Sequence, residues 1–419
     1  MPSVRIVVAA VAAVAAGVAT PVYAFHRQTP PIVELTSTGD NTGILPRVHP
    51  EFFSPLILSI DTHTLDPTGY FRKQLLPSGF GPGGSSVNSI GRQNWFDKRL
   101  QELANTGDPA NPSASGSGLQ VAWDGECTLL CNGQGRQIFS WKLNHVTQIT
   151  HDASGTSTNP AYDGRGDLLA FQSQGDLIGD NPGGTSQIFT ATLNQPTGNA
   201  PQITQVTHGA GTSVSPVLDF TGHDLVFQST NDTDGLDTGI PQIWLGVAGL
   251  PPEPITQGAA PSVSPDLSGD GHVVVFQSTA DLTGDGHDTG VPQVFAYDTR
   301  FRVLRQVTND PAGCTNPTVH EYKIDWRVAY VCHGTAFLAL VNARQHFRVP
   351  VPPGADTAQV LDFENNFVVV STTAYLTGGN PTALTPASGT TEGHQLYLVN
   401  LFKLPPIALD AGAPTGIRR

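Results

Sequence analysis

The chain has 419 residues, of which 45 are glycine, 34 are proline and only 13% are charged. Many turn formers and few charged residues favour an all-β fold and exclude long charged helices. The formal net charge of -14 argues against nucleic acid or an anionic membrane surface as a partner, and leaves cations, basic partners or simple solubility as explanations.

Residues 1–24 are expected to be a secretory signal peptide. Arg5 is the only early charge, the run from Ile6 to Ala19 is apolar or small, and Val22-Tyr23-Ala24 has the small residues of a cleavage site. The apolar run approaches the length of a membrane span, so an uncleaved anchor is the alternative. A proline and small residues before the expected cleavage site favour cleavage, which predicts a secreted or periplasmic protein with no membrane span.

Residues 25–97 are expected to be an N-terminal extension that forms a strap over one face or a partial blade. They contain one strand-like stretch, Pro55 to Asp61, and a tract rich in Gly, Pro and Ser from Pro77 to Ser89. These residues are what remains before the repeats begin.

From residue 98 to residue 403 the chain repeats one supersecondary unit. Each good copy has an Asn/Ser-Pro step, then Phe-Gln-Ser, then Gln followed by an apolar and an aromatic residue. The three best copies are Asn159-Pro160 with Phe171-Gln172-Ser173 and Gln187-Ile188-Phe189, Ser215-Pro216 with Phe227-Gln228-Ser229 and Gln242-Ile243-Trp244, and Ser264-Pro265 with Phe276-Gln277-Ser278 and Gln293-Val294-Phe295. Worn copies start at Asn111-Pro112 and Asn316-Pro317. Successive prolines from Pro160 lie 56, 49 and 52 residues apart, a period that is typical of propeller blades.

Each unit is expected to fold into four antiparallel strands, the fourth being a short segment such as Gln205-Val206-Thr207. A further worn unit from Phe367 to Tyr397 gives six blades in all, with seven as the alternative. The early segment Arg99 to Ala104 is expected to complete the last blade, because a closed ring has no exposed sheet edge. Residues 404–419 are expected to form a disordered tail.

The Pro-anchored strand, the Gly turn, the strand ending in Phe-x-Ser and the Gln-Ile-Phe strand resemble the WD40-like (PD40) repeats of TolB-like six-bladed β-propellers. The resemblance covers residues 98–403. Ser264-Pro265-Asp266 with Gly269 is similar to the family's Ser-Pro-Asp-Gly signature, whereas other copies depart from it at the Asp. The resemblance implies a periplasmic or secreted interaction module, and no particular partner, because such propellers serve as binding scaffolds, sensor domains and parts of enzymes.

The four cysteines are expected to form two disulfides, because an exported chain meets an oxidising compartment. Cys314 stands three residues before Pro317 and Cys332 occupies the Ser position of Phe-Gln-Ser, so the two face each other across a hairpin that turns near Lys323. Cys127 and Cys131 would then close a short loop. A zinc site is the alternative, disfavoured because the short spacing is C-x3-C and the other pair is far away.

The loops between second and third strands are rich in aspartate and glycine. Such oxygen-rich loops can wrap Ca²⁺, which takes six to eight oxygen ligands, although the loop that starts at Asp232 lacks the Glu that closes an EF-hand loop. The alternative is that Asp and Gly form Asx turns and keep the surface soluble. The predicted calcium ligands are Asp232, Asp234, Asp237, Asp281, Asp285 and Asp288.

No catalytic residue is predicted. Asp237-Thr238-Gly239 and Asp288-Thr289-Gly290 occupy one repeat position, so repetition rather than an aspartic-protease dyad explains the two triplets. There is no Gly-x-Ser-x-Gly sequence, and no two His residues have metal-binding spacing, so His151 and His208 are expected to cap turns. The repeated aromatic residues are expected to pack between blades rather than form a carbohydrate platform.

These patterns predict an exported six-bladed propeller that works as a non-catalytic binding or scaffolding module for a protein, peptide or ligand, through its acidic loops or its axial opening. The alternative is an exported metal-assisted hydrolase or lyase with its site at the axial opening. Ca²⁺ is the one cofactor considered, and neither nucleic acid nor a membrane is an expected partner.

Overall fold

The computed structural model describes residues 32–34, 68–75, 87–94, 100–104, 110–349, 359–372 and 395–400, apart from short internal gaps. The gaps are residues 117–119, 128–134, 143–144, 153–154, 195–199, 285–289, 323–324, 343–344 and 365–366. The expected signal peptide, the strand-like stretch from Pro55 and the expected tail lie outside the described residues. Within the described part, the chain has no helix long and apolar enough to cross a membrane.

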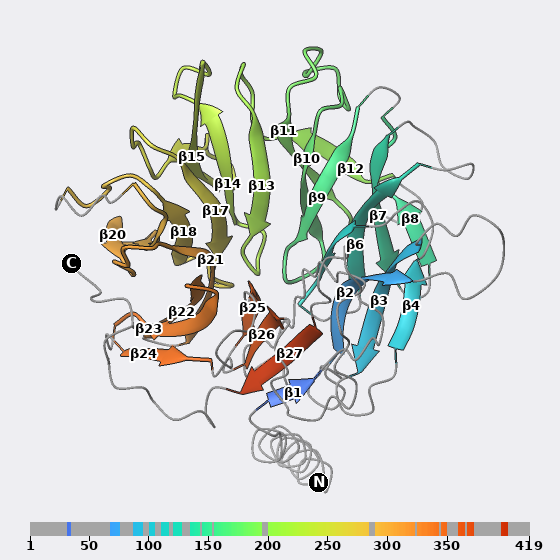
Figure 1. The fold of residues 1–419 in the computed structure, drawn as a ribbon. Helices are drawn as coiled ribbons and strands as arrows, with labels where there is room; N and C mark the ends of the chain where they lie inside the picture. Colours follow the sequence, from blue (N-terminus) through green and yellow to red (C-terminus); the bar gives the residue numbers. More distant parts are fainter. Residues whose placement is uncertain are drawn as a thin grey trace, which may run out of the picture.

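Every element of the described part is a β-strand, and consecutive strands form antiparallel sheets (Figure 1). Five four-stranded sheets occupy residues 110–348, each with its strands in chain order. Their strands are β5 (Ala110–Ala114), β6 (Gln120–Glu126), β7 (Arg136–Lys142), β8 (His145–Gln148); β9 (Ser157–Tyr162), β10 (Leu168–Ser173), β11 (Gln187–Thr192), β12 (Gln202–Gln205); β13 (Ser213–Leu218), β14 (Asp224–Asn231), β15 (Asp237–Val247), β16 (Glu253–Pro254); β17 (Ser262–Leu267), β18 (Val273–Ser278), β19 (Gln293–Asp298), β20 (Val303–Gln306); and β21 (Cys314–Tyr322), β22 (Asp325–Cys332), β23 (Thr335–Leu340), β24 (Gln345–Arg348).

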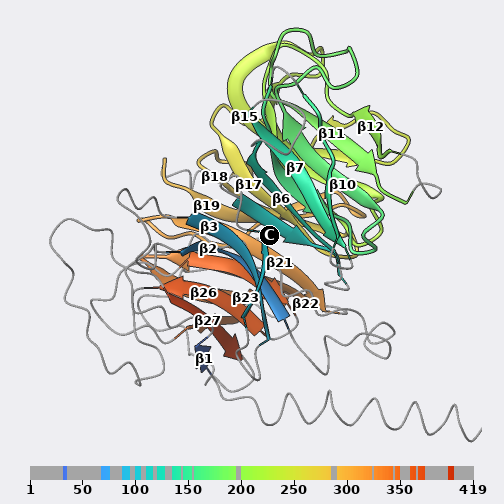
Figure 2. The same cartoon turned by 90° about the vertical axis from the view of Figure 1, so that its right-hand side faces the viewer.

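Two further sheets use segments near the chain ends. Their strands are β2 (Thr68–Leu75), β3 (Val87–Asn94) and β4 (Leu100–Ala104) in one, and β1 (Ile32–Glu34), β25 (Gln359–Glu364), β26 (Phe367–Thr372) and β27 (Gln395–Asn400) in the other. The N-terminal strand β1 pairs with β27, Ile32 lying opposite Val399, and Figures 1 and 2 both show β1 beside β27. A strand from the start of the chain therefore completes the last sheet.

The closing strand and the number of sheets differ from the sequence prediction. The segment from Arg99 was expected to complete the last blade, but β4 pairs with β3 instead, and β1 takes the outer place. Because β2, β3 and β4 form a sheet of their own, seven sheets are present in the described residues. The six-blade count omitted this sheet because residues 68–94 contain neither the Asn/Ser-Pro step nor Phe-Gln-Ser.

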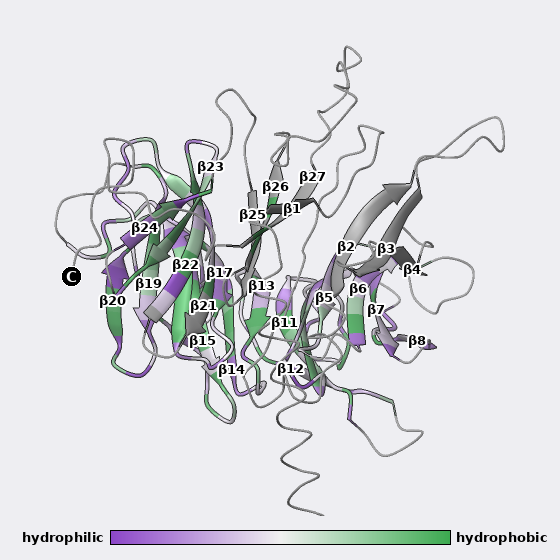
Figure 3. Ribbon diagram, turned by 90° about the horizontal axis from the view of Figure 1, so that it is seen from below, coloured by the Kyte–Doolittle hydropathy of each residue, from purple (hydrophilic) through white to green (hydrophobic). Residues whose placement is uncertain are grey.

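Consecutive sheets pack face to face through their central strands, which is the arrangement of a β-propeller. One core cluster joins Val226 and Ile243 of the β13–β16 blade to Phe276 and Phe295 of the β17–β20 blade. The rings of Phe276 and Phe295 stack at 5.7 Å between centroids. Figure 3 shows that the outermost strands β8 and β24 are mostly hydrophilic. The core therefore lies between the sheets, as expected for the central apolar runs.

The repeated aromatic residues belong to this core. Their side chains are at most 8% exposed, and a stacked pair recurs in the blades that start at β5, β9, β13 and β17. The residues are Trp123, Phe171, Phe227 and Phe276 on the second strands, with Phe189, Trp244 and Phe295 on the third. The prediction of core packing is confirmed, and these rings do not form an exposed platform.

The Asn/Ser-Pro step produces a bulge in the innermost strand of each repeat. The residue before the proline has a positive φ, 52° at Asn159 and 57° at Ser215, and the pairing register shifts at the same place, between Val214 and Val217 in β13. Asn tolerates this left-handed conformation better than most residues. Proline fits beside it because it has no N–H to donate to the ladder.

The outermost strands begin and end earlier than predicted. Gln205-Val206-Thr207 was expected to be a fourth strand, whereas β12 ends at Gln205. Val206 then donates its N–H to the carbonyl of Ile188 at 2.8 Å, and the hydroxyl of Thr207 accepts the N–H of Ile188 at 2.8 Å. These two residues cross the start of β11 and carry the chain to the next blade.

Candidate functional site

The loops between the second and third strands differ most from one blade to the next. They comprise residues 174–186 and 279–292, the two-residue turn 333–334 and the hairpin tip 230–241, which includes the end of β14 and the start of β15. These segments are called the loop face below. The three long loops contain eight aspartates and neither lysine nor arginine. Among the described residues of these three loops, the exposed carboxylates are Asp176, Asp180, Asp234 and Asp237.

The connections that enter the next blade run along the loop face. Ser213, the first residue of β13, donates its backbone N–H to the carbonyl of Ser186 at 2.7 Å, and Ala210 donates to the carbonyl of Gly235 at 2.9 Å. Cys314 makes the corresponding bond to Pro292 at 2.7 Å. The loops are therefore attached to a rigid framework, which is the usual setting of binding residues in loop-based sites.

In the hairpin tip 230–241 the carboxylates stabilise turns. The carboxylate of Asp232 accepts two backbone N–H groups of its own turn, both at 2.9 Å, and that of Asp237 accepts the N–H of Gly239 at 2.9 Å. A hydrogen bond with the Thr230 side chain, followed by the bond from Gly239, lowers the pKa of Asp237. These local contacts are those of Asx turns, the alternative to a calcium site.

The third long loop is described only in part. The carboxylate of Asp281 accepts the N–H of Gly284 at 2.9 Å, whereas Asp285 and Asp288 lie outside the described residues. Calcium binding by the six predicted aspartates therefore stays a prediction, as does the interpretation of the second Asp-Thr-Gly triplet.

The repeated Gln of Phe-Gln-Ser links each blade to the next. The side-chain carbonyl of Gln172 accepts the backbone N–H of Ser215 in the following blade at 2.9 Å, and the same bond recurs in the next two blades. Asp124 takes the place of this Gln in the β5–β8 blade and accepts the N–H of Asn159 at 3.2 Å. The repeated amides therefore serve the scaffold.

Asp124 is the one buried carboxylate at this repeated position. It is fully buried, its carboxylate lies 2.7 Å from Nε of Arg136, and Asn111 donates an amide hydrogen to it at 2.8 Å. A buried charge with an ion-pair partner and several hydrogen-bond donors is stable in place, so we assign Asp124 a structural role.

The other repeated polar residues are also used within the blades. Side-chain hydroxyls of the first and second strands lie 2.9 Å apart in three blades, and the pairs are Ser157 with Ser173, Ser213 with Ser229, and Ser262 with Ser278. The Gln that starts the third strand accepts a bond from the Thr after the fourth, 2.6 Å from Thr207 to Gln187. His151 and His208 are exposed beside these contacts, and their role in turns stays a prediction.

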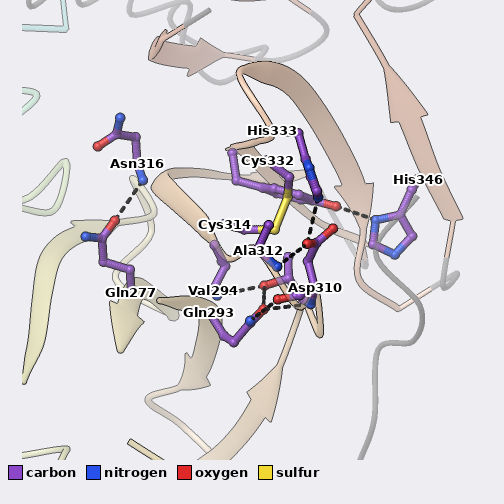
Figure 4. Close-up of a disulfide and its surroundings, with 12 residues drawn as sticks. Gln277, Gln293, Val294, Asp310, Ala312, Cys314, Asn316, Cys332, His333 and His346 are labelled. Carbon is purple, nitrogen blue, oxygen red and sulfur yellow. Dashed lines mark hydrogen bonds and ion pairs between the residues drawn. A yellow bond between two sulfur atoms is a disulfide. The ribbon is translucent and has the colours of Figure 1, made fainter. Parts of the chain in front are cut away.

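The β21–β24 blade departs from the repeat at the loop face. Cys314 and Cys332 form the expected disulfide, with 4.4 Å between their Cα atoms, in the register position of the Ser pairs. Beside it, Nε2 of His333 lies 2.7 Å from a carboxylate oxygen of Asp310 (Figure 4). Asp310 is buried, whereas the His333 side chain is 55% exposed. An imidazole and a carboxylate thus meet the disulfide at the surface.

A second histidine lies deeper in the same blade. The hydroxyl of Tyr330 lies 2.5 Å from Nδ1 of His346, and both side chains are buried. Burial raises the pKa of Tyr330 well above its usual value, with a contribution from the charge of Asp310. Burial also lowers the pKa of His346 to about 4, so His346 is neutral at pH 7.

Sequence analysis did not identify the Asp310–His333 pair. One feature could have pointed to His333. The two-residue connection between β22 and β23 is His333-Gly334, and both residues have positive φ, 51° and 68°, as a type I′ turn requires. Asn is the usual first residue of that turn, so a His there suggests a use for the imidazole.

Cys127 is also disulfide-bonded, and Cys131 lies outside the described residues. Among the described residues, the one group of three metal-type ligands that lies close enough to share an ion is Asp310, Cys314 and Cys332. None of the predicted calcium ligands belongs to that group.

No family model matches the chain, and no curated protein matches it either. Among solved structures it is similar to TolB from Acinetobacter baumannii, with 12% identity and a TM-score of 0.40 over 62% of this chain and 60% of that one. It is also similar to a putative TolB from Agrobacterium tumefaciens, with 17% identity and a TM-score of 0.38 over 53% of this chain and 75% of that one. A third similar structure is the β-propeller domain of the Trilobed protease from Pyrococcus furiosus, with 10% identity and a TM-score of 0.47 over 79% of this chain and 91% of that one.

The chain is a β-propeller, as its own sheets show. Its likeness to TolB and to the protease domain is a likeness of fold, and at these identities and TM-scores it carries no argument about activity. The chain also spans less than two thirds of the length of the Acinetobacter TolB.

Proposed function

We propose that this chain is a binding module without catalytic activity, and that the loop face contacts a positively charged protein or peptide. The observation that carries the proposal is a difference between two groups of polar residues: one is used in the scaffold, and the other faces solvent. The repeated Gln, Ser and Thr side chains are used in bonds within and between blades, whereas the loop carboxylates Asp176, Asp234 and Asp237 are exposed.

Charge supports a basic partner. The three long loops have no lysine or arginine to neutralise their aspartates, and the whole chain carries a formal charge of -14. Complementary charge speeds association and discourages wrong partners, and its effect weakens as salt rises. The same loops also carry exposed apolar side chains that a partner could bury. Ile178 is 43% exposed and Leu236 is 63% exposed.

We also propose that the protein is secreted or periplasmic. The disulfide between Cys314 and Cys332 supports this location, because disulfides persist in oxidising compartments and are rare in the cytosol. A cell fractionation that finds the chain in the cytosol, with both cysteines reduced, would contradict it.

Affinity capture from the exported fraction of the protein's own cell tests the binding proposal. The bait is the wild-type chain or a variant with Asp176→Asn, Asp234→Asn and Asp237→Asn, in which the new amide oxygens can still accept the turn hydrogen bonds. We expect the variant to capture at least tenfold less partner than the wild type does. Added salt should weaken capture by the wild type.

The matched control removes three charges elsewhere, with Asp167→Asn, Asp270→Asn and Glu253→Gln. We expect it to capture the partner like the wild type. Equal loss in both variants would show an effect of net charge alone, and loss only in the control would place the binding surface elsewhere; either result overturns the proposal. Calcium is tested in parallel: if the loops hold Ca²⁺, excess chelator lowers the melting temperature.

A further inference from the structure

Four side chains of metal-binding types meet where β21 and β22 reach the loop face. They are Asp310 on the entering connection, Cys314 at the start of β21, Cys332 at the end of β22 and His333 in the turn. We propose that these four residues form a Zn²⁺ site that the disulfide keeps closed and that reduction of the disulfide opens.

Three of the four ligand atoms already lie close enough to share an ion, and the fourth lies next to Asp310. A carboxylate oxygen of Asp310 and the two sulfur atoms all lie within 4.8 Å of one another, and Nε2 of His333 is 2.7 Å from Asp310. Figure 4 shows His333, Asp310 and the disulfide grouped together. Two thiolates, one imidazole and one carboxylate provide four ligands of the types that Zn²⁺ takes in tetrahedral sites. In a zinc site the four ligand atoms would move to the usual Zn–S, Zn–N and Zn–O distances of about 2.0–2.3 Å.

The blade departs from the repeat at several of these positions together. Where Cys314 and Cys332 stand, three other blades have serines that hold the two strands with one hydrogen bond, so the position does not need sulfur to pair its strands. Where His333 stands, those blades have Gln174, Thr230 and Thr279, and where Asp310 stands, they have Asp152, Gly209 and Gly258. Among these four blades, only the β21–β24 blade has residues of metal-ligand types at all four positions.

The framework holds the ligands in place even without the disulfide. Gln293 donates an amide hydrogen to the carbonyl of Asp310 at 2.6 Å and accepts the N–H of Asp310 at 3.0 Å, which fixes the backbone of that residue. Cys314 and Cys332 are direct cross-strand partners in the β21–β22 ladder. A preformed arrangement of this kind lowers the cost of metal binding, because little has to be ordered when the ion arrives.

The opening step is a thiol–disulfide exchange. A dithiol reductant gives two electrons and two protons to the Cys314–Cys332 disulfide, which becomes two thiols, while the dithiol becomes a disulfide. Zn²⁺ then displaces the two thiol protons and binds both thiolates, the neutral imidazole of His333 and the carboxylate of Asp310. The hydrogen bond between His333 and Asp310 gives way to two bonds to the metal.

Metal titration of the full exported chain tests the proposal, with Co²⁺ and Zn²⁺ as the probes. The protein is reduced with a trialkylphosphine, which takes an oxygen atom from water as it supplies two electrons and adds no competing thiol. We expect the reduced chain to bind one equivalent of Co²⁺ with strong near-ultraviolet thiolate-to-cobalt absorption, which Zn²⁺ abolishes, and the oxidised chain to show neither.

Two variants separate this site from other effects. In the Cys314→Ser, Cys332→Ser double variant the strands regain the serine pair of the other blades, and Cys127 and Cys131 remain to report any contribution of their own. In His333→Asn the turn keeps a residue that suits its positive φ. We expect the double variant to lose the cobalt spectrum and His333→Asn to weaken Co²⁺ binding at least tenfold, with unchanged far-ultraviolet circular dichroism in both.

Three outcomes would overturn the proposal. They are a reduced wild-type chain that takes up no metal, a serine double variant that binds Co²⁺ as the wild type does, and a reduced chain that unfolds and is not refolded by Zn²⁺. Equal binding by His333→Asn would remove His333 from the ligand set and with it the four-ligand site proposed here.

Discussion

The β21–β24 blade and the β13–β16 blade share one backbone plan and use different side-chain chemistry on it. Cys314 lies opposite Cys332 in one, and Ser213 lies opposite Ser229 in the other. In both, the register shifts at the bulge before the proline. The shared backbone arrangement therefore depends on burial and strand pairing. At this cross-strand position, either a disulfide or a hydrogen bond between serines can link the two strands.

The same two blades differ at their loops. The connection from β22 to β23 is the two residues His333 and Gly334, whereas the hairpin tip 230–241 carries three aspartates. A two-residue turn fixes the direction of its side chains, and a longer one offers exposed groups to a partner. One blade is therefore suited to holding a small ion and the other to contacting a macromolecule.

The largest effect is expected at the aromatic position that the blades share. Phe276→Ala removes a ring that is fully buried between two blades, and we expect it to lower the free energy of unfolding by about 3–5 kcal/mol. Urea denaturation measures the change. Phe301→Ala is the control, because that ring is 72% exposed and its loss should stay within about 0.5 kcal/mol. Equal effects of the two substitutions would contradict the inter-blade core.

The pH dependence of stability should distinguish the blade with the buried histidine. Because the pKa of His346 is about 4 in the folded chain and about 6.5 when unfolded, the unfolded state binds more protons between these values. The contribution of neutral His346 to the free energy of unfolding is therefore complete above pH 6.5 and is lost as pH falls towards 4. The loss should reach about 1.4 kcal/mol per pH unit at most.

The control for this pH effect copies a neighbouring blade. Tyr330→Phe with His346→Leu gives the pair that Phe276 and Leu304 form at the same register in the β17–β20 blade. The urea midpoint of the wild type should fall relative to that of the double variant as pH falls from 6.5 to 4, because only the wild type loses the histidine contribution. A constant difference across this range would show that His346 is not the group responsible.

Removal of the disulfide should have a moderate effect. Cys314→Ser with Cys332→Ser deletes a crosslink with a sequence separation of 18 residues, which is worth about 3 kcal/mol, and restores a hydrogen bond worth about 1 kcal/mol. We expect a net loss of about 2 kcal/mol in urea denaturation under oxidising conditions. If the double variant lost no stability, a serine pair would be a full substitute for the disulfide.

The reverse exchange should have the smallest effect. Ser213→Cys with Ser229→Cys places cysteines at the register position that the β21–β24 blade uses, and we expect them to form a disulfide on oxidation. Engineered disulfides give less than the ideal value, so a gain of about 1 kcal/mol is expected after the lost hydroxyl bond. Mass spectrometry detects the bond, and free thiols after oxidation would show that the two blades differ in backbone geometry.

Much of the fold could be predicted from the sequence, because the repeat fixes which residues are buried. The Phe of Phe-Gln-Ser, the paired positions of Cys314 and Cys332, and the strands β26 and β27 all follow from its register. The β2–β4 sheet could not be predicted, because its residues lack the repeat. The closing strand β1 is three residues long, too short to have a pattern of its own.

The candidate site was predicted less well, and for a different reason. The aspartate-rich loops are visible in the sequence because they recur. The Asp310–His333 pair is not, because its members are 23 residues apart and His333 has no counterpart in the other blades. The roles of Gln172 and Asp124 were likewise hidden, because each accepts a hydrogen bond from the following blade. The repeat pattern does not show which residues of neighbouring units are in contact.

The sequence by itself determined the all-β class, the order of strands within each repeat and the cysteine pair, because these depend on burial periods and on contacts within one hairpin. Only the tertiary structure decided which strand closes the last sheet, which polar residues bind the blades together and which ones meet beside the disulfide. Those outcomes depend on contacts between segments far apart in the chain, where the local pattern carries no information about the partner.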